Sequence, residues 1–214
     1  MSGALEAPAP ATGEDGRREQ NKAENRAKIL AAARDVFTEL GYEGATVRDI
    51  VRRTDLASGT FYNYFPDKKS VFRALLYEME LRRRALRREA TRDAVDLAGF
   101  LEGGYRAYFE HVASDLPMFE MMRRNSGVLG GFFEDPMLME GAEAMHVGIK
   151  QAIVRGEVPA VDAEYLAGAF IGIAWEVAVR MSRRRNPDVQ EATELATQMA
   201  LGGLERIARR GRAR

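Results

Sequence analysis

Two stretches decide the fold of this chain, and they read Gly44-Ala45-Thr46-Val47-Arg48-Asp49-Ile50 and Ser58-Gly59-Thr60-Phe61-Tyr62-Asn63-Tyr64-Phe65-Pro66-Asp67-Lys68. In the first stretch, Thr46 is a typical N-cap residue for a short helix predicted over residues 47–54. In the second, a helix predicted over residues 58–64 would bury Phe61 and bring Phe65 to the same core. Helices this short need longer neighbours to cover their apolar faces.

Longer amphipathic helices are predicted on both sides of these stretches. Apolar residues recur every three or four positions over residues 21–40, and Gly41 is placed to end that helix. A further helix is predicted to begin at Asp67, and its apolar stripe ends where the charged run 82–89 begins. This helix would therefore leave the small domain and connect it to the rest of the chain.

The remainder of the chain has helical periodicity, and no segment alternates with a period of two. The predicted fold class is therefore all-α. A disordered tail is expected over residues 1–20, a three-helix N-terminal domain over 21–68 and a larger helical domain over 69–210. Several of the later helices begin with an Asp, followed in two cases by a Pro. Their predicted ranges are 95–113, 115–122, 135–156, 162–184 and 188–209.

Composition excludes several classes of protein. Lys and Arg balance Asp and Glu at 32 each, although basic residues modestly outnumber acidic ones between residues 17 and 69. The absence of cysteine excludes disulfides and thiolate metal sites, and it favours the reducing cytoplasm. The start of the chain lacks the pattern of a signal peptide, and no apolar run approaches the ~20 residues of a membrane helix. We therefore expect a cytoplasmic protein with no membrane association.

The segment from Ile29 to about Leu76, which contains the two quoted stretches, resembles the helix-turn-helix of the TetR family of transcriptional regulators. An apolar helix ending in Gly is followed by Thr-Val-x-x-Ile and then by Gly-Thr-aromatic-Tyr-x-Tyr-Phe-x-x-Lys, at fixed offsets. The resemblance implies a homodimer that binds palindromic double-stranded operator DNA. It also implies that residues 21–68 form the DNA-binding domain and residues 69–210 a ligand-binding and dimerisation domain.

The resemblance further implies which residues contact DNA. A recognition helix must enter a major groove about 12 Å wide, and small residues at its start let the backbone approach the bases. Asn63 is the main candidate for sequence specificity, because an amide can pair bidentately with adenine. Residues at the positions of Thr46, Tyr62, Tyr64 and Lys68 commonly contact phosphates, and those at Arg48, Ser58, Gly59, Thr60 and Asn63 lie at or near the bases.

Some of these residues have a structural alternative. Thr46 could be only a helix cap, although capping does not exclude a phosphate contact. Tyr62 and Tyr64 could be packing residues, but two positions apart on a helix they point to different sides. Arg52 and Arg53 are expected to be solvated surface residues.

Two positions depart from the family pattern. Asp55 stands where a turn glycine is usual, and Ala57 stands where a serine or similar cap is usual. Asp tolerates left-handed backbone geometry better than most residues, so the turn can survive. Capping of the recognition helix is weakened, and Ser58 could take over that role.

The C-terminal helices are rich in aromatic residues and methionine, which suit adaptable apolar surfaces. We predict an apolar effector of fatty acyl type, the latter from a loose resemblance of segments 105–122 and 158–176 to acyl-responsive family members. The alternative is that these residues only fill a helical core. Polar groups that could orient a ligand are scattered (Tyr105, Tyr108, His111, Asn125 and Glu176), and no charged cluster is evident. The predicted pocket residues are Tyr105, Phe109, Phe119, Met122, Phe133, Met145, Phe170 and Trp175.

The last two helices are predicted to form the dimer interface. Small and large apolar residues alternate on them, which favours close helix crossing, and packing against a second copy would make a four-helix bundle. A two-fold dimer that reads palindromic half-sites gains both affinity and discrimination. The predicted interface residues are Leu166, Phe170, Ile173, Met199 and Leu204.

Two other functions were weighed against a ligand-released regulator. The first is a DNA-binding regulator with no small-molecule ligand, controlled by a protein partner or constitutive. The second is an enzyme, which is disfavoured because His111 and His146 fall on separate predicted helices without metal-ligand spacing or a nucleophile motif. We predict no cofactor and no metal site.

Overall fold

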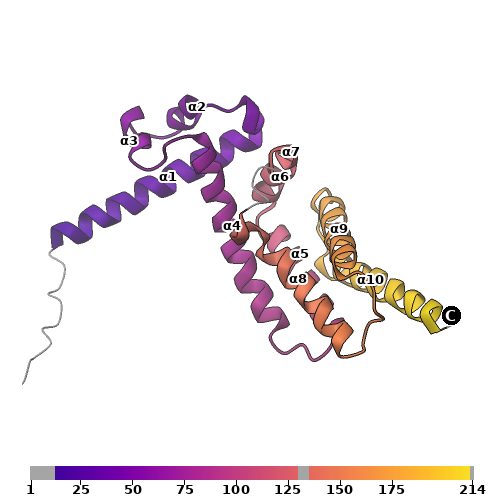
Figure 1. Ribbon diagram of the computed structural model, residues 1–214. Helices are drawn as coiled ribbons and strands as arrows, with labels where there is room; N and C mark the ends of the chain where they lie inside the picture. The colour runs from indigo at the N-terminus through magenta and orange to yellow at the C-terminus, as the bar shows by residue number, and fades with distance from the viewer. Residues whose placement is uncertain (1–12, 130–134, 213–214) are drawn as a thin grey trace, which may run out of the picture. The chain divides into compact units, whose positions relative to one another are not determined.

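The computed structural model describes residues 13–129 and 135–212, and every regular element in these ranges is an α-helix (Figure 1). The predicted all-α fold class is therefore confirmed. The helices are α1 (Gly13–Gly44), α2 (Val47–Arg52), α3 (Ser58–Tyr62), α4 (Lys68–Thr91), α5 (Leu97–Ser114), α6 (Leu116–Arg124), α7 (Ser126–Leu129), α8 (Pro136–Val154), α9 (Ala163–Ser182) and α10 (Val189–Arg212).

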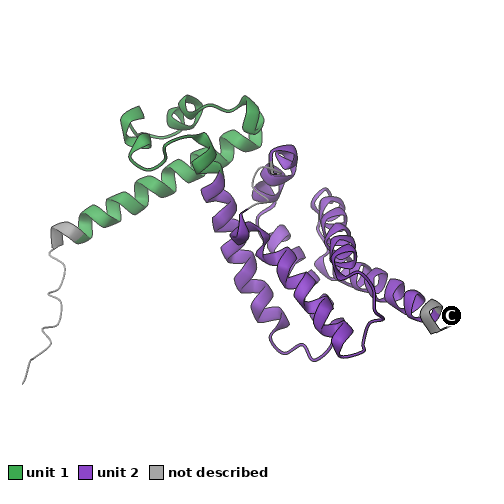
Figure 2. Ribbon diagram, in the orientation of Figure 1, with its two compact units in different colours: residues 1–72 green, residues 73–214 purple. Residues whose placement is uncertain are grey.

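Contacts divide the chain into two units, residues 1–72 and residues 73–214 (Figure 2). The division falls after Phe72, whereas the sequence placed the boundary after residue 68. Helix α1 begins at Gly13, so residues 13–20 are helical rather than part of a disordered tail. These turns carry polar pairs such as Gln20 Nε2 donating to Glu24 Oε1 at 3.1 Å. They lack the apolar stripe on which the prediction depended.

One apolar core holds α1, α2 and α3 together in the first unit. Phe37 of α1 meets Phe72 edge-on, with ring centroids 5.1 Å apart. Ile50 of α2 and Phe61 of α3 are fully buried. Burial of side chains of this size contributes about 1.5–3 kcal/mol each. Tertiary packing, more than helix propensity, therefore stabilises the two short helices.

Gly41 turns the chain near the end of α1. Its φ of 72° and ψ of 167° lie in a region that only glycine adopts readily. The predicted break at Gly41 is therefore present, although helical turns resume as far as Gly44. The turn places the ring of Tyr42 5.8 Å from Phe37 and 5.0 Å from Phe72.

Helix α5 is central to the second unit, where it contacts α8, α9 and α10. Its Leu101 and Phe109 are fully buried. As the sequence predicted, aspartates begin the surrounding helices. Asp115, Asp135 and Asp162 each accept a hydrogen bond from a backbone amide in the first turn of α6, α8 and α9 respectively.

Helices α4, α5 and α8 approach one another closely at two glycines. A Cβ on Gly103 of α5 would lie 2.4 Å from the carbonyl oxygen of Ala90 in α4. A Cβ on Gly148 of α8 would lie 2.8 Å from the Phe100 ring of α5. Glycine at these positions allows the three helices to form the walls of a cavity in the second unit.

Candidate nucleic-acid interface and ligand cavity

Thr46 caps α2, and both of its hydrogen-bond donors are engaged. Its backbone amide donates to Asp49 Oδ2 at 3.0 Å, and its hydroxyl donates to the same carboxylate. The Asp49 amide donates back to Thr46 Oγ1 at 3.2 Å, which completes a capping box. These bonds lower the pKa of Asp49 and keep its carboxylate charged. The structure therefore favours the capping role of Thr46, with both donors engaged inside the domain.

The turn between α2 and α3 is built without left-handed geometry. No residue other than glycine has a positive φ in the described ranges, so Asp55 does not use the conformation expected of it. Instead the Asp55 carboxylate accepts from Lys28 Nζ of α1 at 3.0 and 3.2 Å. Thr54 Oγ1 donates to the Val51 carbonyl at 2.8 Å. Side-chain bonds to α1 and α2 thus replace the conformational freedom of a turn glycine.

Helix α3 presents a polar face opposite its buried one. Phe61 is fully buried, while Tyr62 is 58% exposed. Ala57 is the N-cap residue and makes no side-chain cap bond, so Ser58 does not take over capping and is the first helical residue. The predicted base-facing residues share this accessibility, since Arg48, Ser58, Gly59 and Asn63 are exposed and Thr60 is half-buried.

The two tyrosines of the motif differ in their surroundings. Tyr62 lies against the buried Phe61 ring, with centroids 5.4 Å apart, and its other side faces solvent. Tyr64 is half-buried, and its hydroxyl oxygen accepts a hydrogen bond from Asn25 Nδ2 of α1 at 3.3 Å. Tyr64 thus helps to fix α3 on α1 and keeps its hydroxyl proton for a further partner.

Lys68 is tied to the first unit by three interactions. Its Nζ donates to the carbonyl oxygens of Tyr42 at 2.7 Å and Ala45 at 2.9 Å. It also lies 4.5 Å from the centre of the Tyr42 ring. The predicted phosphate contact must therefore share an ammonium group that already joins the start of α4 to the end of α1 and to Ala45 after it.

A second candidate site is a cavity of about 610 Å³ within the second unit. This volume lies in the range of about 300–1,000 Å³ that is typical of small-molecule sites. Most of the lining is apolar and comes from α4, α5, α6, α8 and α9. The predicted pocket residues that line it are Tyr105, Phe119, Met122, Met145 and Trp175.

Two of the predicted pocket residues are not among the described residues that line the cavity. Phe109 and Phe170 are at most 3% exposed and belong to the core around α5, so the structure corrects both assignments. Each lies on an apolar helix face, and periodicity alone cannot distinguish a core position from a cavity wall. Phe133 lies outside the described residues.

Only some of the polar groups expected to orient a ligand line the cavity. Tyr105 is buried and donates its hydroxyl to the Phe170 carbonyl at 3.2 Å. Tyr108 and His111 line the cavity; burial raises the pKa of Tyr108 to about 12 and lowers that of His111. Both groups are therefore neutral near pH 7. Asn125 and Glu176 do not line the cavity; Asn125 Nδ2 donates to the Met121 carbonyl at 2.7 Å, and Glu176 pairs with Arg180.

Sequence reasoning missed three charged residues of α4 that line the cavity: Glu80, Arg83 and Arg87. They fall within or next to the charged run 82–89, where the sequence predicts that the helix connects the two domains. A signal was nevertheless present, because these positions continue the helix face of Leu76 and Met79 at spacings of three and four. Leu76 and Met79 also line the cavity.

The structure also corrects the predicted dimer face. Phe170 is 3% exposed and Leu204 is 7% exposed, so both belong to the core of the protomer and are not part of a dimer interface. Leu166 and Ile173 are half-buried, and Met199 is 55% exposed. Other large apolar side chains of α9 and α10 do face solvent, namely Tyr165, Ile171, Leu195 and Ile207.

Two further structural findings concern metals and membranes. Within residues 13–129 and 135–212, no group of three or more His, Cys, Asp or Glu side chains could hold a metal ion. None of the helices in the described part of the chain is both long enough and apolar enough to cross a membrane.

Sequence comparisons identify relatives of the N-terminal unit. Residues 29–75 match the profile of a family described as "Bacterial regulatory proteins, tetR family". The HTH-type transcriptional repressor AcnR of Corynebacterium glutamicum is 44% identical over 54 residues, which cover 25% of this chain and 29% of that protein. The HTH-type transcriptional regulator UidR of Escherichia coli is 33% identical over 64 residues, covering 30% of this chain and 33% of that protein. The match thus spans a third or less of these curated relatives.

Solved structures resemble a much larger part of the chain. The fatty acid degradation regulator FadR from Bacillus halodurans has a TM-score of 0.72 at 22% identity, covering 84% of this chain and 95% of that one. The ketosteroid transcriptional regulator KstR2 of Mycobacterium tuberculosis has a TM-score of 0.64 at 22% identity, covering 84% and 94%. These similarities show that the fold is shared over most of both chains. The relatives named here are transcriptional regulators, and none of them is an enzyme.

Proposed function

We propose that the protein is a transcriptional repressor of TetR type that a small molecule releases from DNA, because residues 29–75 match the model of that family. In this proposal a cytoplasmic homodimer binds a palindromic double-stranded operator. The effector is apolar and of fatty acyl type. The observation that carries the DNA-binding part is the exposed polar face of α3, fixed by the buried Phe61 behind it.

The DNA contacts that we propose fall into two groups. Ser58, Gly59 and Thr60 lead α3 into the major groove, and Arg48 and Asn63 reach base edges beside them. Tyr62 contacts a phosphate with its hydroxyl, for which its exposure leaves room. Thr46, Tyr64 and Lys68 are bonded within the domain, so they act mainly by holding α2 and α3 in position.

The homodimer is proposed to form through α9 and α10. Tyr165 is 81% exposed and Leu195 is 50% exposed, so each helix presents large apolar surface that a second copy could cover. Ala169, Gly202 and Gly203 are small and exposed on the same two helices, which favours close packing of helix backbones. A two-fold dimer carries two copies of α3, one for each half-site of a palindrome.

The ligand response is proposed to pass through α4. At its start, Lys68 bonds to the carbonyls of Tyr42 and Ala45 in the first unit. Farther along, Leu76 and Met79 line the cavity of the second unit. A ligand that binds one position of α4 better than another shifts the equilibrium between states, whereas equal affinity for both would change nothing. Half-sites about one helical turn apart tolerate little change in the separation of the recognition helices.

The test is selection of bound sequences from a random duplex pool by the purified protein, repeated with apolar ligands present. The proposal predicts enrichment of a palindromic sequence and loss of binding when an effector is added. A palindrome whose binding no apolar ligand affects would instead support a regulator without a small-molecule effector. No enrichment would contradict the DNA-binding proposal. Asn63→Ala is expected to relax the selected sequence mainly at one position, at a cost of about 1–3 kcal/mol in discrimination.

A further inference from the structure

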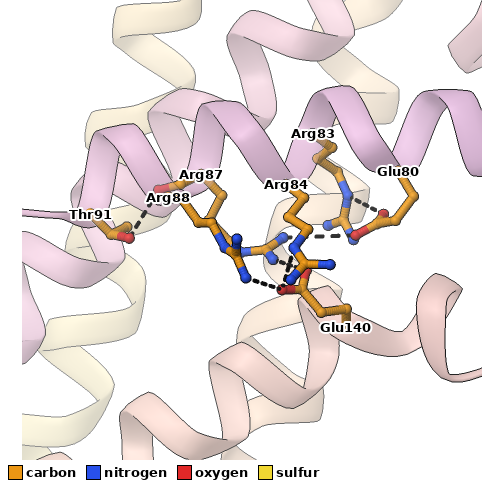
Figure 3. A network of polar contacts seen from close by, with 7 residues as sticks. All are labelled: Glu80, Arg83, Arg84, Arg87, Arg88, Thr91 and Glu140. Atoms are coloured by element: carbon orange, nitrogen blue, oxygen red, sulfur yellow. Dashed lines mark hydrogen bonds and ion pairs between the residues drawn. The ribbon is translucent and has the colours of Figure 1, made fainter. Parts of the chain in front are cut away.

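One wall of the cavity carries a cluster of arginines. Glu80, Arg83 and Arg87 of α4 line the cavity, and Glu140 of α8 lies beside them (Figure 3). Arg83 Nε donates to Glu80 Oε2 at 2.7 Å. Arg87 Nη2 donates to Glu140 Oε2. The remaining members, Arg84 and Arg88, approach Glu140 Oε1 at 3.1 and 3.8 Å.

Positive charge exceeds negative charge in this network. Figure 3 shows four arginines converging on only two glutamates. Glu80 is 3% exposed and the Arg87 side chain is 13% exposed, so these two groups are shielded from water, whereas the Arg84 and Arg88 side chains are 37% and 64% exposed. Burial raises the pKa of Glu80, whereas Arg83 and Arg87 lower it. A buried guanidinium is costly unless an anion pairs with it.

Hydrogen bonding within the network is also incomplete. Arg87 Nη1 and Glu80 Oε1 are 3.9 Å apart, which is too far for a hydrogen bond. Both atoms are buried, and neither has a hydrogen-bond partner within the described ranges. Arg87, which lines the cavity, therefore has a guanidinium nitrogen whose hydrogen-bonding capacity is unused within the described ranges.

The position of Arg83 is fixed by a glycine on the facing helix. A Cβ on Gly141 of α8 would lie 2.2 Å from Arg83 Nη2, so any other residue would displace the guanidinium. The cavity wall also contains one further acid, Asp115, and one further base, His111. The Asp115 carboxylate accepts from the Met118 amide at 3.1 Å, and burial keeps His111 neutral. The two arginines that line the cavity thus lie together on α4, and the rest of the lining is mostly apolar.

We propose that the cavity binds an amphipathic anion, an apolar chain whose single carboxylate or similar head group pairs with Arg83 and Arg87. The chain lies along the methionine and aromatic side chains of α5, α6 and α8. This inference rests on the proposed effector site and specifies the charge of the ligand, which the sequence did not reveal. Planar guanidinium groups suit such a head group because they bind carboxylates through paired, charge-assisted hydrogen bonds.

The test compares three probes with the same chain: dodecanoate, dodecanol and dodecylamine, titrated calorimetrically into the full-length protein without DNA. We expect one dodecanoate per protomer, bound at least about tenfold more tightly than dodecanol. Gly104→Leu should reduce binding of dodecanoate and dodecanol alike. Gly104 lines the cavity with open space in front of it, so the added side chain occupies the site.

Arginine variants locate the head group. Arg83→Gln and Arg87→Gln should each bring the dodecanoate-to-dodecanol affinity ratio toward one. Arg88→Gln should leave it nearly unchanged, because the Arg88 side chain is 64% exposed and does not line the cavity. If a variant fails to fold, the comparison of probes on the unmodified protein still decides the question.

The remaining outcomes of the binding experiment test the head group and the effector site separately. Equal binding of dodecanoate and dodecanol would overturn the anionic head group and leave the apolar effector site standing. If dodecylamine bound more tightly than dodecanoate, Glu80 would be identified as the group that holds the head group, and the proposal would be overturned. No binding of any probe would contradict the effector site itself, while the DNA selection would still test the rest of the proposed function.

Discussion

Lys68→Met separates a structural role of Lys68 from a phosphate contact. The substitution keeps most of the apolar stem but removes the ammonium that bonds to the Tyr42 and Ala45 carbonyls and lies over the Tyr42 ring. Hydrogen bonds to charged groups contribute about 1.5–3 kcal/mol each, and an exposed cation–π contact about 0.5–1 kcal/mol. Because Lys68 is only half-buried, water replaces part of these interactions. We expect the free energy of unfolding to fall by about 2 kcal/mol.

The assay is urea unfolding followed by circular dichroism, with Lys69→Met as the matched control. Lys69 is the next residue of α4 and is exposed, so its variant should change stability by no more than about 0.5 kcal/mol. The salt dependence of DNA binding provides the second readout. If Lys68 acted mainly on phosphate, Lys68→Met would leave stability unchanged and flatten the slope of log K against log salt by about one unit. That result would refute the structural role assigned to Lys68.

Four further predictions follow from single features of the structure. Gly41→Ala should lower stability by about 2 kcal/mol in urea unfolding, because its backbone geometry disfavours a side chain; a Gly16→Ala variant that loses as much would contradict this reason. Gly104→Leu should not lower the melting temperature, since helix propensity improves and the Cβ has open space, and a fall would show that no such space exists. Met199→Asp should convert dimers to monomers in sedimentation, and an unchanged mass would exclude this face. Burial, Arg83 and Arg82 lower the pKa of His111 below 6.5, and Asp115 opposes them, so the unfolded chain binds the proton more readily. The contribution of neutral His111 to the free energy of unfolding is complete above about pH 6.5 and is lost as the pH falls. A His111→Gln variant whose stability has the same pH dependence would contradict this prediction.

The N-terminal domain was predictable because its signals are local. Thr46 before Val47 and the spacing of Phe61 and Phe65 specify two short helices and the sides that they bury. Cap residues also specified where later helices begin, since Asp115, Asp135 and Asp162 all act as predicted. Such signals depend on neighbours in sequence, so one sequence reveals them.

The misplaced features depend on tertiary contacts. The first turns of α1 are polar and carry no apolar stripe, so periodicity did not detect them. Phe170 and Leu204 lie on amphipathic helices, and only the packing of the protomer shows that their side faces inward rather than toward a second copy. The arginines of α4 were not predicted to line a site, because their contacts with Gly141 and Glu140 of α8 join residues that are far apart in the sequence.

The central claim is that a symmetric pair presents two α3 helices to one duplex, and the spacing of the selected half-sites tests it directly. The measurement is the affinity for the selected operator before and after insertion of about five base pairs between its half-sites, half of a turn of about 10–10.5 base pairs. The account predicts that two protomers bind the original duplex and that the insertion abolishes this binding, because one half-site is rotated to the far side. Undiminished binding of two protomers to the altered duplex would contradict it.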